Sequence, residues 1–275
     1  VSGNLDLDGA ATGLTSTSVS GTSNLGASVT TTSSQTYTGA VTLSANNIIT
    51  TTNSNVSFGS TIDSDSTTRN LTFNTGSGTV SITGNVGADA DLGVVTLTQT
   101  GGTTFNGTLN AATLNLTDTT DAANITFNGN VSATTLNTAA EGYNVIFNGT
   151  TSSITNAVTF SNSGSVTFGN GTGDTTTFTG GVTATAPSQV NLAGTIQTTN
   201  NTMSLGDAGT PIVLTANTIL SGNTAGAITL GGTVNGAYSL TVNTTGDTTF
   251  SLAVGNTTAL TTLTTNASGT TYING

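Results

Sequence analysis

The sequence predicts an all-β protein folded as a parallel β-helix (β-solenoid) of about twelve coils of 20–24 residues each. Three observations predict this class. Short segments alternate apolar and polar residues, and these segments recur at a nearly constant interval. The chain is also rich in Thr and Val, which favour strands, and almost free of the helix formers Lys, Arg, Glu and Met.

The clearest repeat lies in residues 103–160. A unit made of an apolar residue or Thr, then Thr or Ile, then Phe-Asn-Gly occurs three times, with Phe at 105, 127 and 147. The rings are therefore 22 and 20 residues apart, which is the interval expected of stacked coils. Alternation around each Phe is typical of a half-buried strand. We interpret the Asn-Gly that follows as a turn, because both residues tolerate positive φ.

Two tracks of apolar residues share this period. In a β-solenoid each strand lies above its counterpart in the previous coil, so each track should form one ladder. The first track is Phe58, Ile82, Phe105, Phe127, Phe147, Phe168 and Leu192, and the second is Phe73, Leu97, Leu116, Leu136, Val158 and Phe178. Beyond Leu192 the register is less clear, and we expect Leu230 and Phe250 to recover it.

We expect one solenoid domain over residues 1–275, since no change of composition marks a boundary. Residues 1–34 should form less regular N-terminal coils, and residues 35–275 should form the repeats. Polar loops are expected at 63–70 and 87–93. Pro211 precedes an apolar run, and the first residue of a strand is a position that tolerates proline.

Composition excludes several function classes. Charged residues make up 5% of the chain, the net charge is −11, and Arg69 is the only basic residue. A basic surface for nucleic acid is therefore absent, and we expect no nucleic-acid partner. The sequence has no Cys, hence no disulfide, and no apolar run long enough for membrane insertion.

The candidate catalytic residues are carboxylates alone, because the chain has no His or Cys. Glycoside hydrolysis needs two carboxylates on either side of a bond, and a lyase needs a base and a cation. Most carboxylates stand singly, as expected of solvated turn residues: Asp118, Asp121, Glu141, Asp174, Asp207 and Asp247. We therefore expect no enzyme, and no catalytic, cofactor-binding or metal residue.

Two acidic pairs form the exception, Asp63 with Asp65 and Asp89 with Asp91. Both pairs follow the first track at nearly the same distance in consecutive coils, so stacking should bring four carboxylates together. Such a cluster either raises its own pKa values or recruits a cation such as Ca²⁺. The favoured reading is a pair of exposed loops with Arg69 as the counter-charge, and Ca²⁺ binding is the alternative.

Two surface alternatives were weighed. The Phe residues of the first track could stack on sugars, but an interior aromatic stack is favoured, because Thr would then face outward. The run Thr96-Leu97-Thr98-Gln99-Thr100 is similar to the flat threonine faces of ice-binding solenoids. That activity requires the Thr pair at one register on successive coils, and the sequence reveals no such ladder, so it is not favoured.

Residues 28–60, SVTTTSSQTYTGAVTLSANNIITTTNSNVSFGS, and 70–87, NLTFNTGSGTVSITGNVG, resemble the repeats of filamentous-haemagglutinin-type, autotransporter-like bacterial adhesins. The resemblance covers most of the chain. It implies a right-handed parallel β-helix in a secreted protein of the bacterial cell surface. Because the family's integrin-binding RGD motif does not occur in this sequence, no functional residue is carried over.

We therefore expect a structural extracellular protein, an adhesin shaft or fibre subunit in surface attachment or biofilm matrix. The alternative is a carbohydrate-active enzyme or carbohydrate-binding module on the same scaffold. The expected partners are surface glycans and the chain itself, joined head to tail or continued in a longer shaft. The join is suggested by the ends, since TTYING followed by VSGNLDL is similar to the internal TTFNGTLNAATLNL. In such a join Leu5 and Tyr272 should both point into a shared core.

Overall fold

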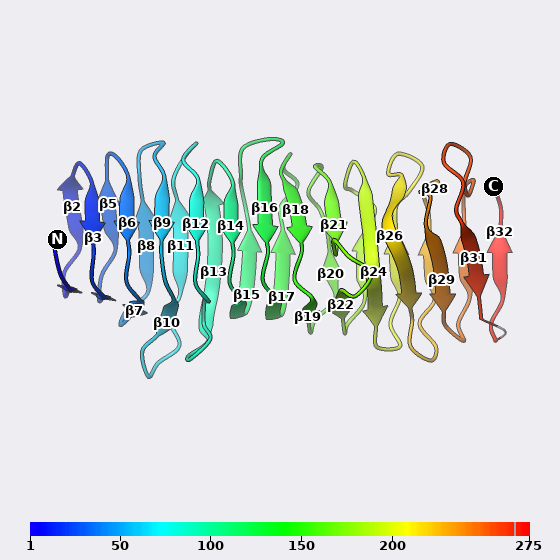
Figure 1. Ribbon diagram of the computed structural model, residues 1–275, viewed down its shortest axis with the longest axis horizontal. Helices are drawn as coiled ribbons and strands as arrows, with labels where there is room; N and C mark the ends of the chain where they lie inside the picture. Colours follow the sequence, from blue (N-terminus) through cyan, green and yellow to red (C-terminus); the bar gives the residue numbers. More distant parts are fainter. Residues whose placement is uncertain (267) are drawn as a thin grey trace. The chain divides into compact units, whose positions relative to one another are not determined.

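The computed structural model describes residues 1–266 and 268–275. Within these residues there is no α-helix, and the parallel strands stack as a β-solenoid of about twelve turns (Figure 1). The predicted fold class is therefore confirmed. The chain divides into two compact units, Val1–Asn137 and Thr138–Gly275, and each is described by itself.

The first unit contains three ladders of parallel strands, and the first of them continues beyond β10 only as isolated bridges at Val86 and Leu109. The first ladder consists of β1 (Leu5–Leu7), β4 (Ser23–Leu25), β7 (Val41–Leu43) and β10 (Ile62–Ser64). The second consists of β3 (Thr17–Val19), β6 (Gln35–Tyr37), β9 (Val56–Phe58), β12 (Val80–Ile82), β14 (Thr103–Phe105) and β16 (Asn124–Phe127). The third consists of β2 (Ala11–Leu14), β5 (Val29–Thr31), β8 (Asn47–Thr50), β11 (Leu71–Asn74), β13 (Leu92–Gln99), β15 (Leu109–Leu116) and β17 (Val131–Thr138).

The second unit is built in the same way. One ladder consists of β18 (Asn144–Phe147), β21 (Val166–Phe168), β24 (Val190–Thr198), β26 (Ile212–Ser221) and β28 (Val234–Asn235). Another joins β19 (Thr151–Ile154) and β22 (Thr175–Phe178) to the later halves of β24 and β26, then to β29 (Ser239–Asn243) and β31 (Thr262–Thr265). The third consists of β20 (Val158–Thr159), β23 (Val182–Ala184), β25 (Met203–Leu205), β27 (Ile228–Leu230), β30 (Thr248–Phe250) and β32 (Thr271–Ile273).

The core of the first unit is a column of aligned apolar side chains. Tyr37, Phe58, Ile82, Phe105 and Phe127 occupy one register through five turns, and each is at most 1% exposed. The Tyr37 and Phe58 rings stack with centroids 4.9 Å apart, and those of Phe105 and Phe127 with centroids 5.2 Å apart. The interior aromatic stack expected from the first track is confirmed in this unit.

The second track is correct in the first unit, where Phe73, Leu97 and Leu116 follow one another in register. In the second unit its member is Ile154, which pairs with Phe178, whereas Val158 pairs with Val182 on another ladder. The assignment of Val158 was therefore wrong. The cause is that β19 and β20 lie in quick succession, so spacing alone places an apolar residue of either strand near the same interval.

Leu230 and Phe250 pair with each other, as predicted, but not on the ladder of Leu192. Leu192 pairs with Leu214, whereas Leu230 follows Leu205 on the ladder that begins at β20. The expectation that they recover the first track was therefore wrong. Because all turns have nearly the same length, the number of residues between successive strands is the same in every ladder. That number therefore cannot show to which ladder a residue belongs.

The Asn-Gly turns lie where they were predicted, but glycine is required in them for a different reason. Positive φ occurs in the described residues at several glycines, but not at Asn106, Gly107, Asn128 or Gly129. A Cβ built on Gly107 would instead lie under 3.0 Å from the backbone of Gly84 in the turn before, and one on Gly129 would meet Gly107 in the same way. Glycine is required here because stacked corners approach each other closely.

The N-terminal region is strand-rich. Residues 1–34 contain β1 to β5, and the pairing of β2 with β5 shifts register between Ala11 and Leu14, in keeping with the less regular coils expected there. The two predicted loops are shorter than expected, because Asp63 and Ser64 belong to β10 and Leu92 already belongs to β13.

Candidate functional site

The two acidic segments lie side by side on the first unit, as their phase predicted. The Asp89 backbone N–H donates to Asp63 Oδ1 at 3.0 Å, and the Ser64 hydroxyl donates to the Asp91 carbonyl oxygen at 2.9 Å. Asp65 forms a two-pronged ion pair with Arg69, through Nε at 3.0 Å and NH2 at 2.8 Å. The role of Arg69 as local counter-charge is confirmed.

The four carboxylates do not converge, contrary to the expectation. Among residues 1–266 and 268–275 no group of three or more Asp, Glu, His or Cys side chains is arranged to hold a metal ion. The physical reason is that Asp63 accepts from a backbone N–H of the neighbouring loop, while Asp65 turns to Arg69 and to the Thr67 N–H at 2.8 Å. Binding of Ca²⁺ at Asp63, Asp65, Asp89 and Asp91 stays a prediction to be tested.

The ion pair alters the titration of Asp65. The hydrogen bonds from Arg69, followed by that from the Thr67 backbone N–H, hold the pKa of this carboxyl below its ordinary value. A carboxyl group with a lowered folded-state pKa stabilises the fold above its unfolded pKa. That contribution is lost as the pH falls through the folded pKa. Both side chains are partly exposed, so the contribution is small.

Limited proteolysis tests how this loop is held. Trypsin has a single target, Arg69, whose N–H donates to the Ser64 hydroxyl and whose carbonyl accepts from the Gly93 N–H at 2.8 Å. We expect slow cleavage at this one site, faster cleavage in Asp65→Asn, and no change on addition of EDTA, as measured by mass spectrometry of the fragments. Asp91→Asn is the matched control, since no hydrogen bond to its carboxylate is seen in the described residues.

Acceleration of cleavage by EDTA in the native chain would contradict this account and would instead support a bound cation. Protection that persists in EDTA removes the calcium alternative. Equal rates for Asp65→Asn and the native chain would show that the ion pair does not restrain the loop.

Two of the remaining carboxylates, Asp174 and Asp207, accept hydrogen bonds from nearby backbone N–H groups. Asp174 is buried, and its Oδ2 accepts from the Asn170 and Gly171 N–H groups, each at 2.8 Å. Asp207 accepts from the Gly209 N–H at 2.8 Å, which is the Asx turn that short acidic side chains favour. Both carboxylates fix turns, as predicted, but Asp174 is buried, so the expectation that it is a solvated turn residue was wrong.

The Phe side chains of the first track are interior groups. Phe58, Phe105, Phe127, Phe147 and Phe168 are each at most 1% exposed, so they cannot form a sugar-stacking platform on the surface. The outward face of the same strands carries the residue between the two buried ones. That residue was not singled out from the sequence.

In the first unit these outward positions form a column of hydroxyl side chains, which we name row 1. Its members pair directly through six strands, β3 to β16, in the order Ser18, Thr36, Ser57, Ser81, Thr104 and Thr126. The second unit has a matching column, row 2, on β20 to β30: Thr159, Thr183, Ser204, Thr229 and Thr249. These rows are single columns of Ser and Thr and not a ladder of Thr pairs, so they do not contradict the interpretation that no Thr-pair ladder occurs; the rows themselves were not predicted.

The hydroxyl oxygens of both rows make no hydrogen bond within the part of the chain that the structure describes, so they are open to solvent. Other outward columns link their own turns. Asn24 donates to Asp6 at 2.8 Å, Asn191 to Thr167 at 3.1 Å and Gln197 to the Thr177 hydroxyl at 2.8 Å. The two rows are thus unbroken columns of Ser and Thr whose hydroxyls remain free, whereas other outward columns mix free hydroxyls, as at Thr72 and Thr96, with hydrogen-bonded or apolar side chains.

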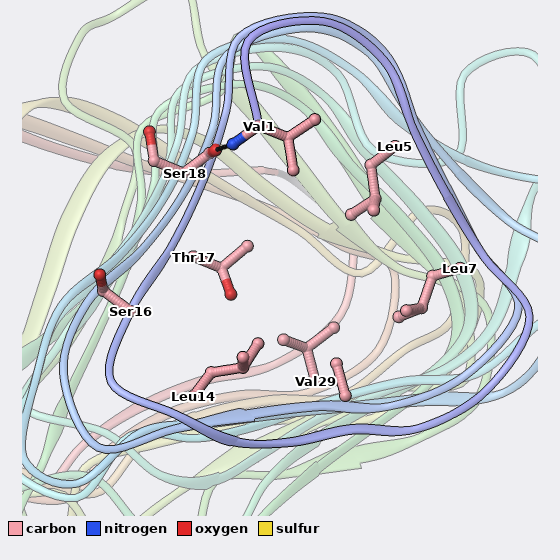
Figure 2. A pocket seen from close by; sticks show the side chains of 9 residues that line it. Val1, Leu5, Leu7, Leu14, Ser16, Thr17, Ser18 and Val29 are labelled. Atoms are coloured by element: carbon pink, nitrogen blue, oxygen red, sulfur yellow. Dashed lines mark hydrogen bonds between the residues drawn. The ribbon is translucent and has the colours of Figure 1, made fainter.

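The first turn encloses an apolar cavity of 290 Å³ (Figure 2). Leu5, Leu7 and Thr17 are directed into this space, as Figure 2 shows. The inward orientation predicted for Leu5 is confirmed. The remaining lining includes Val1, Ala11, Leu14 and Val29.

The prediction that Tyr272 points into the core was wrong. In β32, Tyr272 pairs with the outward Thr249, and Ile273 pairs with Phe250, which is fully buried. Tyr272 therefore faces outward and Ile273 faces inward. The tandem comparison was one residue out of register, and a one-residue slip moves every side chain of a strand to the opposite face. Ile273 is 59% exposed because β32 is the last strand of its ladder.

Comparisons with protein-family models, with curated proteins and with solved structures find no match to this chain. Within the described residues, none of the secondary structure is a helix with the length and apolarity needed to cross a membrane.

Proposed function

We propose that this chain is a structural, extracellular protein, an adhesin shaft or fibre subunit at the bacterial cell surface that serves attachment or matrix formation. The observation that carries the proposal is the continuous pairing of parallel strands from turn to turn within each unit. Every turn hydrogen-bonds to the next, and stacked apolar side chains fill the interior. A repeat protein of this kind gains stability from each added neighbour, which suits it to bear load along its ladders.

The resemblance of residues 28–60 and 70–87 to adhesin repeats supports the same proposal. The outward faces add to it, since Thr, Ser and Asn side chains on them can form many weak hydrogen bonds with surface glycans. Backbone ladders supply rigidity in a chain without disulfides.

The proposed partner is the chain itself, or a continuing turn of the same kind. Two features support this. The apolar cavity lies in the first turn, at the N-terminal end of the ladders, and the edge strand β32 carries the inward Ile273 exposed. In addition, the Asn274 N–H donates to the Phe250 carbonyl at 2.9 Å, as the Asn106 N–H donates to that of Ile82 at 2.8 Å. The last turn therefore ends in the same corner that the internal turns use to continue.

Self-association tests the proposal. We expect the purified chain at high concentration to form filaments in negative-stain micrographs and to scatter light accordingly. Ile273→Asp should abolish them, because a carboxylate in the joined core would be buried without a partner. A head-to-tail contact of this type gives an open fibre.

Tyr272→Asp is the matched control, since it adds the same charge on the adjacent outward position. It should leave filaments intact. Compact monomers of the native chain at high concentration would contradict self-assembly. Equal loss in both variants would show that added charge, and not the buried position, disrupts the contact.

A further inference from the structure

We propose that row 1 and row 2 bind the surface of ice. The ligand class is crystalline water, and the binding groups are the hydroxyl and methyl groups of each row. The inference goes beyond the shaft function and needs no contact between copies.

Spacing is the first argument. Neighbouring strands in a ladder lie about 4.7–4.9 Å apart, so the hydroxyls of a row recur at this interval along the turns. In a tetrahedral water lattice adjacent oxygens are ~2.8 Å apart, and second neighbours are therefore ~4.5 Å apart. The mismatch is about 4–9% per turn, so a few successive hydroxyls can meet lattice oxygens at once.

The free hydrogen-bonding capacity of the rows is the second argument. Row 1 runs through six turns and row 2 through five, and no hydroxyl of either row is used within the described residues. In some other outward columns the polar side chains hydrogen-bond to each other, as Asn191 does to Thr167. A column that binds ice needs hydroxyls that have no hydrogen-bond partner within the protein.

Rigidity and lack of charge complete the argument. Each row residue except Ser18 stands between two buried side chains of its strand, as Thr104 stands between Thr103 and Phe105. The backbone is hydrogen-bonded on both sides, so little conformational entropy is lost on binding. Neither row contains a charged or aromatic residue, and the column of row 2 continues beyond Thr249 to the exposed Tyr272. A sugar-binding surface favours aromatic platforms, and an ionic partner requires charge, whereas ice requires neither.

Partition into slowly growing ice provides the test. A dilute solution of the native chain is frozen from one side, and protein is measured in the ice and in the remaining liquid. We expect enrichment of the native chain in ice. A row variant should lose this enrichment by about tenfold or more, because lysine replaces free hydroxyls in both rows; its substitutions are Ser81→Lys, Thr104→Lys, Ser204→Lys and Thr229→Lys.

The control variant carries four lysines on other outward columns, at Thr72→Lys, Thr96→Lys, Thr175→Lys and Thr195→Lys. Circular dichroism establishes that both variants are folded. The control should partition like the native chain. Exclusion of the native chain from ice overturns the proposal, as does equal loss in both variants or retention of enrichment in the row variant. Retention of the native chain on insoluble polysaccharide without enrichment in ice also overturns it, and would assign the rows to glycans.

Discussion

Replacement of Phe105 by alanine is expected to lower the free energy of unfolding by about 3–5 kcal/mol. The side chain is 1% exposed, and it lies in register between Ile82 and Phe127, against whose ring it stacks at 15°. Its removal leaves a cavity that the fixed strand spacing prevents from closing, and it also removes an aromatic pair that adds about 0.5–1.5 kcal/mol. Urea denaturation followed by circular dichroism measures the change.

Thr104→Ala provides the control on the adjacent residue. Thr104 lies on the outward face of the same strand, so its truncation should change stability by no more than about 0.5 kcal/mol. A similar loss for both variants would contradict the assignment of Phe105 to the core and Thr104 to the surface.

Apolar alternation and repeat interval were sufficient to predict the strands, the parallel stacking and the buried aromatic column of the first unit. They were not sufficient to assign each residue to a ladder. Val158 and the pair Leu230 and Phe250 show why, because every ladder of a solenoid has the same interval. The lengths of the connections between strands decide which ladder a residue joins, and single-residue differences in these connections leave no signature in the spacing.

The candidate surfaces were predicted only in part. The pairing of Asp65 with Arg69 was foreseeable, since they lie four residues apart and Arg69 is the only cation. The outward direction of the Tyr272 side chain was not foreseeable. The similarity of the joined terminal segments to the internal repeat indicates which residue types recur, but it does not fix the strand register. The hydroxyl rows were also missed. Ser and Thr occur throughout the chain, so alignment becomes visible only when the buried neighbours set the register.

The second large effect is expected from substitution of a glycine in the Asn-Gly turns. The sequence placed these turns correctly, but the usual reason for glycine, a positive φ, does not apply to Gly107 or Gly129. Each of these glycines instead faces the backbone of the equivalent corner one turn before, and its missing side chain is what permits the approach. The turn interval and the corner packing are therefore coupled, since ladders at fixed spacing bring corners into contact.

Gly107→Ala is expected to destabilise the fold by about 3 kcal/mol. The added Cβ would lie under 3.0 Å from the carbonyl of Gly84, and this neighbour is backbone held in place by the ladders on either side. Relief therefore requires separation of two turns, which weakens their hydrogen bonds. Urea denaturation against the native chain measures the loss, and hydrogen exchange should show weaker protection at β12 and β14.

Gly9→Ala makes the same chemical change where the chain has room. Gly9 has no positive φ, and a Cβ there would meet nothing within 4 Å. The expected effect is neutral or a gain of about 0.4–1 kcal/mol, because alanine restricts the unfolded chain. Equal losses in the free energy of unfolding for Gly9→Ala and Gly107→Ala would mean that the general preference for glycine in turns, and not the contact between corners, causes the destabilisation. A large loss at Gly107 alone establishes close approach between turns as the reason that glycine follows asparagine in the repeat.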